Sequence, residues 1–165
     1  MTPRVPVRGL IVIAMMLAGG LSNQSHAAGP LQNLDDGWHR WQVPSVVPGK
    51  YETIYVQSKS GQITRIDMLN RWCNSRELGN AIDHGTLSAD ASIDWLQQYI
   101  DSRSALRSDA LAAISRHAGT RALQILIDIV ESSADNDLRE EAVFWMAMSE
   151  SDEAFNYIDR LLMAE

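Results

Sequence analysis

Residues 106–111 (LRSDAL) and residues 138–143 (LREEAV) match in chemistry at a shift of 32 positions. The same shift brings further apolar residues into register: Ile114 with Met146, Ala122 with Ala154, Leu123 with Phe155, Leu126 with Ile158, and Ile129 with Leu161. The apolar residues recur at helical spacing throughout this part of the chain. So many matches in one register predict an internal repeat with two helices in each unit.

Within each unit, the first helix is expected to pack through Ala110, Ile114 and their equivalents, because small alanines let helix backbones approach. Residues 118–119 (AG) and 149–152 (SESD) should break the two helical hairpins, with Ser151 capping the last helix. Residues 135–137 (DND) join the units and place acid where the helix dipole favours it.

The repeat carries a resemblance to a known family. Residues 138–146 (LREEAVFWM) resemble the first helix of bacterial secreted HEAT-repeat proteins, in which an Arg and an Ala open the helix and Phe-Trp sits at its centre. Residues 113–117 (AISRH) are similar to the end of that helix. The resemblance covers residues 105–163; it implies an α-solenoid used for protein–protein contact and supplies no catalytic residue.

The segment before the repeat predicts a β-hairpin. Residues 51–57 (YETIYVQ) and 62–68 (QITRIDM) have the β-branched and alternating character of strands, and a Gly-containing loop joins them. An isolated hairpin is marginal in water, so it should lie on a helix or on a third strand within residues 38–47. Residues 69–83 are expected to be a loop with one helical turn around 76–81.

Ser88 is expected to cap a helix that runs to about Asp101 and stands in as a cap for the array. The sequence therefore predicts an α+β chain in which a small antiparallel β-hairpin or meander precedes a C-terminal α-solenoid of HEAT-like hairpins. The expected segments are a signal peptide at 1–27, a linker at 28–37, a β-rich segment at 38–68, a loop plus capping helix at 69–103, and two HEAT-like repeats at 104–165.

The first residues predict a secretory signal peptide. Two arginines precede the apolar run at residues 10–17, and small residues at 25–27 (SHA) suit a signal peptidase. A membrane-spanning helix needs roughly 20 apolar residues, and a pair of glycines interrupts this run. We expect cleavage after Ala27 and a periplasmic or secreted protein, with an uncleaved anchor as the alternative.

The charge of the chain limits the kinds of partner it is expected to bind. Cleavage of the signal removes two arginines and takes the formal charge from −7 to −9. Residues 104–165 hold 5 basic and 12 acidic side chains, so the repeat is the acidic part. Nucleic acids and anionic membranes attract clustered Lys and Arg, which this chain lacks. A protein partner with a basic surface is expected.

Few residues suggest chemistry. Cys73 is the only cysteine, so it is expected to be buried, paired with another chain, or reactive. No two of the histidines that follow the signal have the spacing of a local zinc site, and His117 should bond carbonyls at a helix end. Asp83 and His84 are expected to be a surface pair and not a catalytic base with its orienting carboxylate. The sequence predicts no catalytic residue, cofactor or metal ligand.

Trp38, Arg40 and Trp41 form the candidate partner-binding cluster, because Trp and Arg are enriched at binding hot spots. The alternative is that the tryptophans fill the core between hairpin and helices. Trp145 is expected in the core of the repeat.

These observations favour a non-enzymatic, exported protein-interaction module, a scaffold or adaptor with an acidic helical-repeat surface. The rival hypothesis is a small-ligand or redox sensor that uses Cys73 and the Trp cluster. Homo-oligomerisation is a third possibility, because Phe155, Ile158 and Leu162 have no following repeat to cover them.

Overall fold

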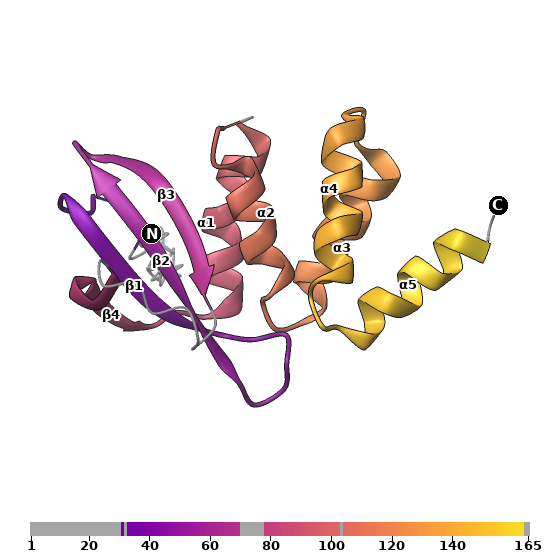
Figure 1. Ribbon diagram of the computed structural model, residues 1–165, viewed down its shortest axis with the longest axis horizontal. Coiled ribbons are helices and arrows are strands. Elements are labelled where there is room, and N and C mark those ends of the chain that lie inside the picture. Colours follow the sequence, from indigo (N-terminus) through magenta and orange to yellow (C-terminus); the bar gives the residue numbers. More distant parts are fainter. Residues whose placement is uncertain (1–30, 32, 70–77, 103, 164–165) are drawn as a thin grey trace, which may run out of the picture.

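A computed structural model describes residues 31, 33–69, 78–102 and 104–163. In these residues a four-stranded mixed sheet is followed by five α-helices, which confirms the α+β class. Figure 1 shows the sheet at one end of the long axis and the last helix at the other. No helix in the described ranges is long and apolar enough to cross a membrane. The expected signal peptide and Cys73 lie outside these ranges.

The sheet has the strand order β3-β2-β1-β4. Its strands are β1 (Gly37–Pro44), β2 (Tyr51–Lys59), β3 (Gln62–Leu69) and β4 (Ile82–Thr86). The first three are antiparallel neighbours, which confirms both the predicted hairpin and its third strand. Strand β4 lies parallel to β1, so the sheet is mixed: it contains the predicted antiparallel meander and one parallel strand that the sequence did not predict.

Strand β4 was not recognisable in the sequence. All five of its residues are exposed, so the strand shows no alternation of apolar and polar side chains. Asp83 and Gly85 have turn character, and the Asp83 carboxylate accepts a hydrogen bond from the Gly85 N–H at 2.9 Å. The predicted loop therefore ends before Ile82. A 3-10 helix at Leu78–Asn80 confirms the single helical turn expected just before it.

One face of the sheet faces the helices and supplies its half of the core. Trp41 and Val43 of β1 lie opposite Ile54 and Glu52 of β2, and side chains that alternate along each strand share a face. The core side chains of the three antiparallel strands are Trp41, Val43, Ile54, Val56 and Ile66. Glu52 is the one charged residue buried on this face.

Five helices continue from the sheet: α1 (Ala89–Asp101), α2 (Arg107–Ser115), α3 (Thr120–Ser132), α4 (Asn136–Ala147) and α5 (Asp152–Met163). Helix α2 contacts β3, α1 packs on α2, α3 packs on α4, and α5 contacts α4 (Figure 1). The helical half is therefore layered along the long axis, beginning at the sheet.

Three pairs of residues related by 32 positions are buried alike. Ala110 and Ala142 are fully buried, as are Ile114 and Met146. Ala122 and Ala154, one turn into α3 and α5, are also buried. At these three positions the register found in the sequence coincides with a repeat of burial. Trp145 is only half-buried against the core, and Phe144 beside it is 53% exposed.

Three helices begin with side-chain caps. The hydroxyl of Ser88 accepts from the Ala91 N–H at 3.2 Å, the carboxylate of Asp135 from the Leu138 N–H at 3.2 Å, and the hydroxyl of Ser151 from the Ala154 N–H at 3.2 Å. Each cap satisfies a backbone donor that has no partner within its own helix. The predicted caps Ser88 and Ser151 are confirmed.

Ser88→Ala should lower the free energy of unfolding by about 1 kcal/mol, because the substitution leaves an N-terminal donor of α1 without its acceptor. Urea denaturation of the mature chain measures this. Ser88→Asp should retain most of the stability, since aspartate is an equally good cap. Ser102→Ala, at the other end of the same helix, is the matched control. Equal effects of the two alanine substitutions would contradict the assigned cap.

Candidate functional site

A buried ion pair joins the sheet to the helical half. Arg116 follows α2, and its guanidinium donates to both carboxylate oxygens of Glu52, at 2.5 and 2.6 Å. The Ser45 hydroxyl donates to the same carboxylate at 3.1 Å. Glu52 is 7% exposed. The bond to Glu52 raises the pKa of Arg116, so this two-pronged contact holds a charged pair where water has little access.

Backbone bonds extend this connection. The Val46 N–H donates to the Arg116 carbonyl at 2.8 Å, and the Ala118 N–H donates to the Pro44 carbonyl at 3.0 Å. Ser45 and His117 face one another in the resulting two-residue bridge. The loop between β1 and β2 is therefore clamped onto the turn between α2 and α3.

His117 lies at the centre of this clamp and is fully buried. Its Nδ1 lies 2.7 Å from the carbonyl of Ala113, which only accepts hydrogen bonds, so Nδ1 carries the proton. Nε2 then accepts from the Ser92 hydroxyl at 2.7 Å. Burial lowers the pKa of His117 to about 4. The predicted bond to a helix-end carbonyl is confirmed, but the imidazole is neutral at pH 7 and adds no charge to the helix dipole.

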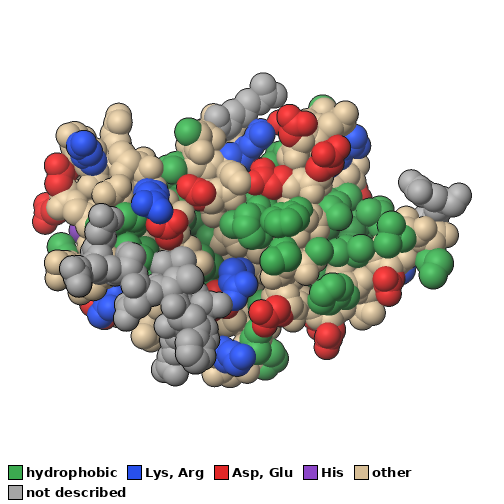
Figure 2. Space-filling model, viewed as in Figure 1, with side chains coloured by type: hydrophobic (Ala, Val, Ile, Leu, Met, Phe, Trp, Pro, Cys, Tyr) green, Lys and Arg blue, Asp and Glu red, His purple; other side chains and the backbone are tan. Residues whose placement is uncertain are grey.

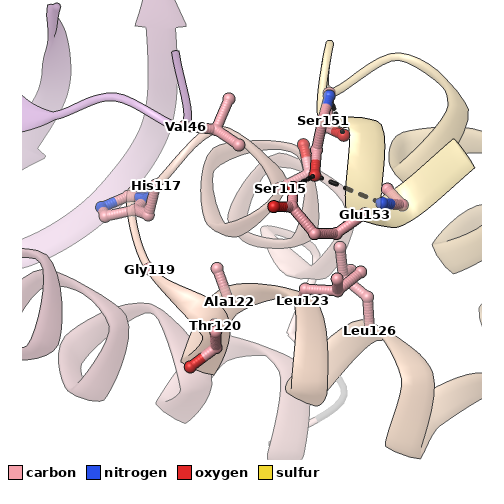
Figure 3. Close-up of a pocket in the computed structure, with 12 residues that line it drawn as sticks. Val46, Ser115, His117, Gly119, Thr120, Ala122, Leu123, Leu126, Ser151 and Glu153 are labelled. Carbon is pink, nitrogen blue, oxygen red and sulfur yellow. Dashed lines mark hydrogen bonds between the residues drawn. The ribbon is translucent and has the colours of Figure 1, made fainter. Parts of the chain in front are cut away.

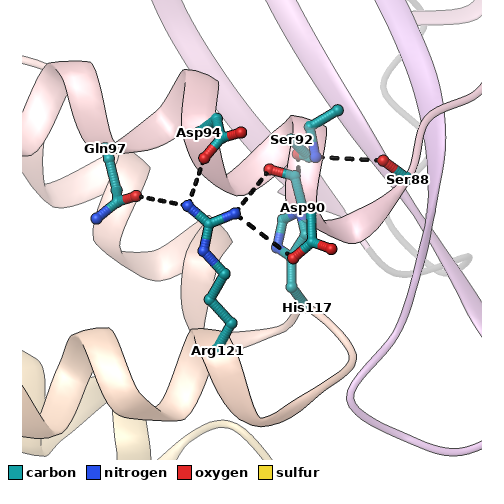
Figure 4. Close-up of polar contacts among 8 residues, drawn as sticks. Ser88, Asp90, Ser92, Asp94, Gln97, His117 and Arg121 are labelled. Atoms are coloured by element: carbon teal, nitrogen blue, oxygen red, sulfur yellow. Dashed lines mark hydrogen bonds and ion pairs between the residues drawn. The ribbon is translucent and has the colours of Figure 1, made fainter.

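A second polar cluster joins α3 to α1. Arg121 donates to the carboxylates of Asp90 and Asp94 and, at 3.2 Å, to the Gln97 side chain (Figure 4). Its bond to Asp94 raises the pKa of Arg121. The cluster is near the surface, where an ion pair contributes little by itself. It links the start of α3 to α1.

The hydrogen bond between Ser92 and His117 joins the same groups as a serine nucleophile and its histidine base, but the other requirements of such a site are not met. Catalysis requires that substrate reach the hydroxyl, yet both side chains are fully buried. The second ring nitrogen is held by a backbone carbonyl and not by a carboxylate. This geometry gives the pair a structural role between α1 and the α2–α3 turn.

A pocket of about 170 Å³ opens beside the same turn (Figure 3). Ala122, Leu123 and Leu126 of α3 form its apolar wall, and Val46 closes one side. On the opposite side Ser151 donates to the Glu153 carboxylate at 3.1 Å. The pocket is large enough for a small aliphatic group. The hydroxyls of its serines, Ser115, Ser149 and Ser151, already form hydrogen bonds with backbone groups at helix ends. Few polar groups are therefore free to bind a substrate.

The edge of the sheet brings together an imidazole pair that the sequence did not predict. His39 Nε2 donates to the Asp35 carbonyl at 2.9 Å, so its Nδ1 accepts from His84 Nε2 at 2.9 Å. The His84 ring stacks on Trp41 with centroids 4.7 Å apart. Partial burial, and next the nearby His39, lower the pKa of His84. Asp83 bonds Arg40 instead, so Asp83 and His84 do not form a base and its carboxylate.

The candidate cluster Trp38, Arg40 and Trp41 is split between the two faces of the sheet. Trp41 is 1% exposed and belongs to the core, as the alternative interpretation expected. Trp38 and Arg40 lie on the other face, where Arg65 lies 5.6 Å from the Trp38 ring centroid and Arg40 pairs with Asp83. The three side chains therefore do not form one patch, because alternate residues of a strand point to opposite faces.

The last two helices expose large apolar side chains. Figure 2 shows hydrophobic side chains gathered over the helical half of one face. The exposed apolar side chains of α5 and of the α4 end, which we name the terminal apolar face, are Phe144, Met148, Phe155, Leu161, Leu162 and Met163. Helical spacing puts Phe155 and Leu162 on one side of α5, and large exposed apolar groups often mark interaction sites. This face is the strongest candidate for a binding surface.

The equivalents of these residues on α3 are better covered. Leu126 is buried, and Leu123, Ile129 and Val130 are half-buried. At positions 32 residues later, Phe155 is 49% and Leu162 68% exposed, and Ile158 is half-buried. The difference arises because α4 packs on α3, whereas none of the described elements packs on the outer side of α5 in the same way.

The described ranges hold no group of three His, Cys, Asp or Glu side chains placed to bind a metal ion. Cys73, the candidate thiol site, lies outside these ranges. Comparison with models of protein families, with curated proteins and with solved structures gives no match.

Proposed function

We propose that this chain is an exported, non-enzymatic interaction module that binds a partner protein through the terminal apolar face. The observation that carries the proposal is the exposure of Phe155 and Leu162, whose equivalents on α3, Leu123 and Val130, are half-buried against the core. The likeness to HEAT repeats supports it, since arrays of stacked helical hairpins serve as binding scaffolds. The signal-like first 27 residues support export.

The sheet has a supporting role in this proposal. The buried pair of Glu52 and Arg116 and the backbone bonds at Val46 fix the first helices to the sheet. A helical array needs a cap that covers its first apolar face and is polar on its outer side. The sheet and α1 fill this place, so one end of the array is closed and the other presents apolar side chains.

Phe155→Asp should reduce binding of the partner at least tenfold, because it places a charge in the centre of the terminal apolar face. Tagged mature protein is incubated with an envelope extract of the native cells, and bound proteins are quantified for wild type and variant side by side. Asn156→Asp is the matched control, since it adds the same charge to the same helix one residue away.

Circular dichroism and urea denaturation of both variants verify that the fold is intact, as expected for exposed positions. A protein that binds wild type and Asn156→Asp but not Phe155→Asp supports the proposal. Equal retention of every bound protein by the three forms would remove the terminal apolar face as the binding surface.

A further inference from the structure

Strand β4 lies at the edge of the sheet beside β1, and all five of its residues are exposed (Figure 1). Its largest apolar side chain, Ile82, is 49% exposed, so burial of apolar area contributes little to its attachment. Within the described ranges, two side-chain hydrogen bonds add to the backbone ladder between β4 and β1. One joins Arg40 to Asp83 at the surface. The other joins His39 to His84.

The bond between the imidazoles connects a buried residue to an exposed one. His39 is 2% exposed, lies opposite Val56 of β2, and donates from Nε2 to the Asp35 carbonyl. Its Nδ1 therefore accepts from Nε2 of His84 at 2.9 Å. His84 is exposed, and its ring stacks on the buried Trp41 with 15° between the two planes. The bond thus ties β4 to the inner face of β1.

This bond requires that the two facing nitrogens share a single proton. A proton taken up by His84 goes to its Nδ1, and Nε2 still donates to a neutral His39. A proton taken up by His39 goes to its Nδ1, which then has no lone pair with which to accept. Two charged rings would then face each other across 2.9 Å and repel. With β4 in place the pair therefore takes up one extra proton at most, whereas the separated rings take up two.

The neighbouring charges do not compensate for a second proton. Burial, and next the charge of His39, lower the pKa of His84, and Asp83 raises it. The Asp83 carboxylate is already bonded to Arg40, on the opposite face of β1 from His39, and to a backbone N–H. Asp35 gives its carbonyl to His39. Among the described residues, no side chain of α1, the helix that contacts β1, shifts the pKa of His84.

We propose that the bond between His39 and His84 is an acid-sensitive latch that holds β4 on the edge of β1. The pKa of His84 is lower with β4 in place than the ordinary value of 6.5. The stabilisation of the closed edge is therefore complete above pH 6.5 and is lost as the pH falls. Release leaves the backbone groups on that edge of β1 unpaired, and a further strand can add to such an edge. The inference concerns the sheet and is independent of the terminal apolar face.

Amide hydrogen exchange, followed residue by residue by NMR and corrected for the intrinsic effect of pH, measures the opening of β4. Protection of the amides in the ladder between β1 and β4 should fall by about tenfold between pH 7 and pH 5, because each additional proton bound by the open form changes the equilibrium tenfold per pH unit. The ladder between β2 and β3 should keep its protection, which shows that the rest of the sheet is intact.

Two variants of the latch and one control assign the effect. His39→Gln should remove the response to pH, because an amide can donate to the Asp35 carbonyl and accept from His84 but does not titrate. His84→Ala, at an exposed position, should give low protection of the ladder at both pH values. Arg40→Gln removes the bond to Asp83 on the same strand; it should lower protection equally at pH 7 and pH 5 and leave the ratio unchanged.

Two results would overturn the latch. One is equal protection of the ladder between β1 and β4 at pH 7 and pH 5 in the wild-type chain. The other is a loss on acidification that His39→Gln and His84→Ala both reproduce in full, since another group would then be responsible. Protection in His84→Ala at pH 7 that equals the wild-type value would likewise show that the imidazole bond does not hold β4.

Discussion

Arg116→Met is expected to lower the free energy of unfolding by about 3 kcal/mol. The substitution leaves the Glu52 carboxylate, 7% exposed, without the guanidinium that donates to both of its oxygens. The cost comes mainly from a buried charge without a partner, since the methionine retains most of the apolar contact of the arginine stem. Urea denaturation of the mature chain at pH 7 measures the loss.

The double variant Glu52→Leu with Arg116→Met distinguishes the cost of an unpaired buried charge from other effects of replacing Arg116. Replacing a buried ion pair by apolar residues of similar size is often close to neutral, so this variant should recover much of the stability lost by Arg116→Met alone. Arg40→Ala is the control for an exposed pair, because Arg40 and Asp83 are both accessible to water; its effect should be under about 1 kcal/mol. Equal losses for Arg116→Met and Arg40→Ala would contradict the clamp.

Acidification from pH 6.5 to pH 4 should cost about 3 kcal/mol of stability through His117 alone. Burial lowers the pKa of this imidazole to about 4 in the folded chain, from 6.5. The unfolded chain therefore binds the proton first. The stabilisation is complete above pH 6.5 and is lost progressively as the pH falls to 4.

Carboxylates affect the stability at lower pH values. Asp83 and Asp135 have pKa values below 3.8, chiefly because backbone N–H groups donate to them, so their contributions are lost only at pH values below 4. Thermal or urea denaturation at half-unit steps of pH separates the two windows. His117→Gln should flatten the curve between pH 6.5 and 4, since an amide can both donate to Ala113 and accept from Ser92 but does not titrate. A slope that survives in His117→Gln would contradict the assignment.

The sequence predicted most of the local structure because its signals were periodic or chemical. The hairpin is seen in the alternation of residues 51–57 and 62–68, and the helix starts are seen at Ser88 and Ser151. The mixed sheet escaped prediction because β4 is exposed along its whole length and carries no alternation. Parallel pairing between β1 and β4 is a long-range contact that local pattern does not encode.

The polar contacts were harder to foresee, although two signals were present. Glu52 stands in phase with Ile54 and Val56 on the inward face of β2, and an acid at such a position must find a partner. Ser92 stands one helical turn before Leu96 on the buried face of α1. Their partners, Arg116 and His117, come from 64 and 25 residues away and could be identified only once the fold was known.

The candidate site was partly foreseen. Phe155, Ile158 and Leu162 were expected to lack cover, and Phe155 and Leu162 are exposed. The exposure of Phe144 and Met148 was not predicted, because the resemblance places Phe-Trp at the centre of a packed helix. The predicted cluster of Trp38, Arg40 and Trp41 does not form, because alternate residues of strand β1 point to opposite faces of the sheet.

Photo-crosslinking from position 155 tests the central claim most directly. A benzophenone amino acid replaces Phe155 in the chain expressed in its native cells, and the same amino acid replaces Tyr51, which is 59% exposed on the sheet, as the control. Irradiation should give one discrete adduct of higher mass from position 155 and none from position 51. No adduct from position 155, or the same adducts from both positions, would contradict binding through the terminal apolar face.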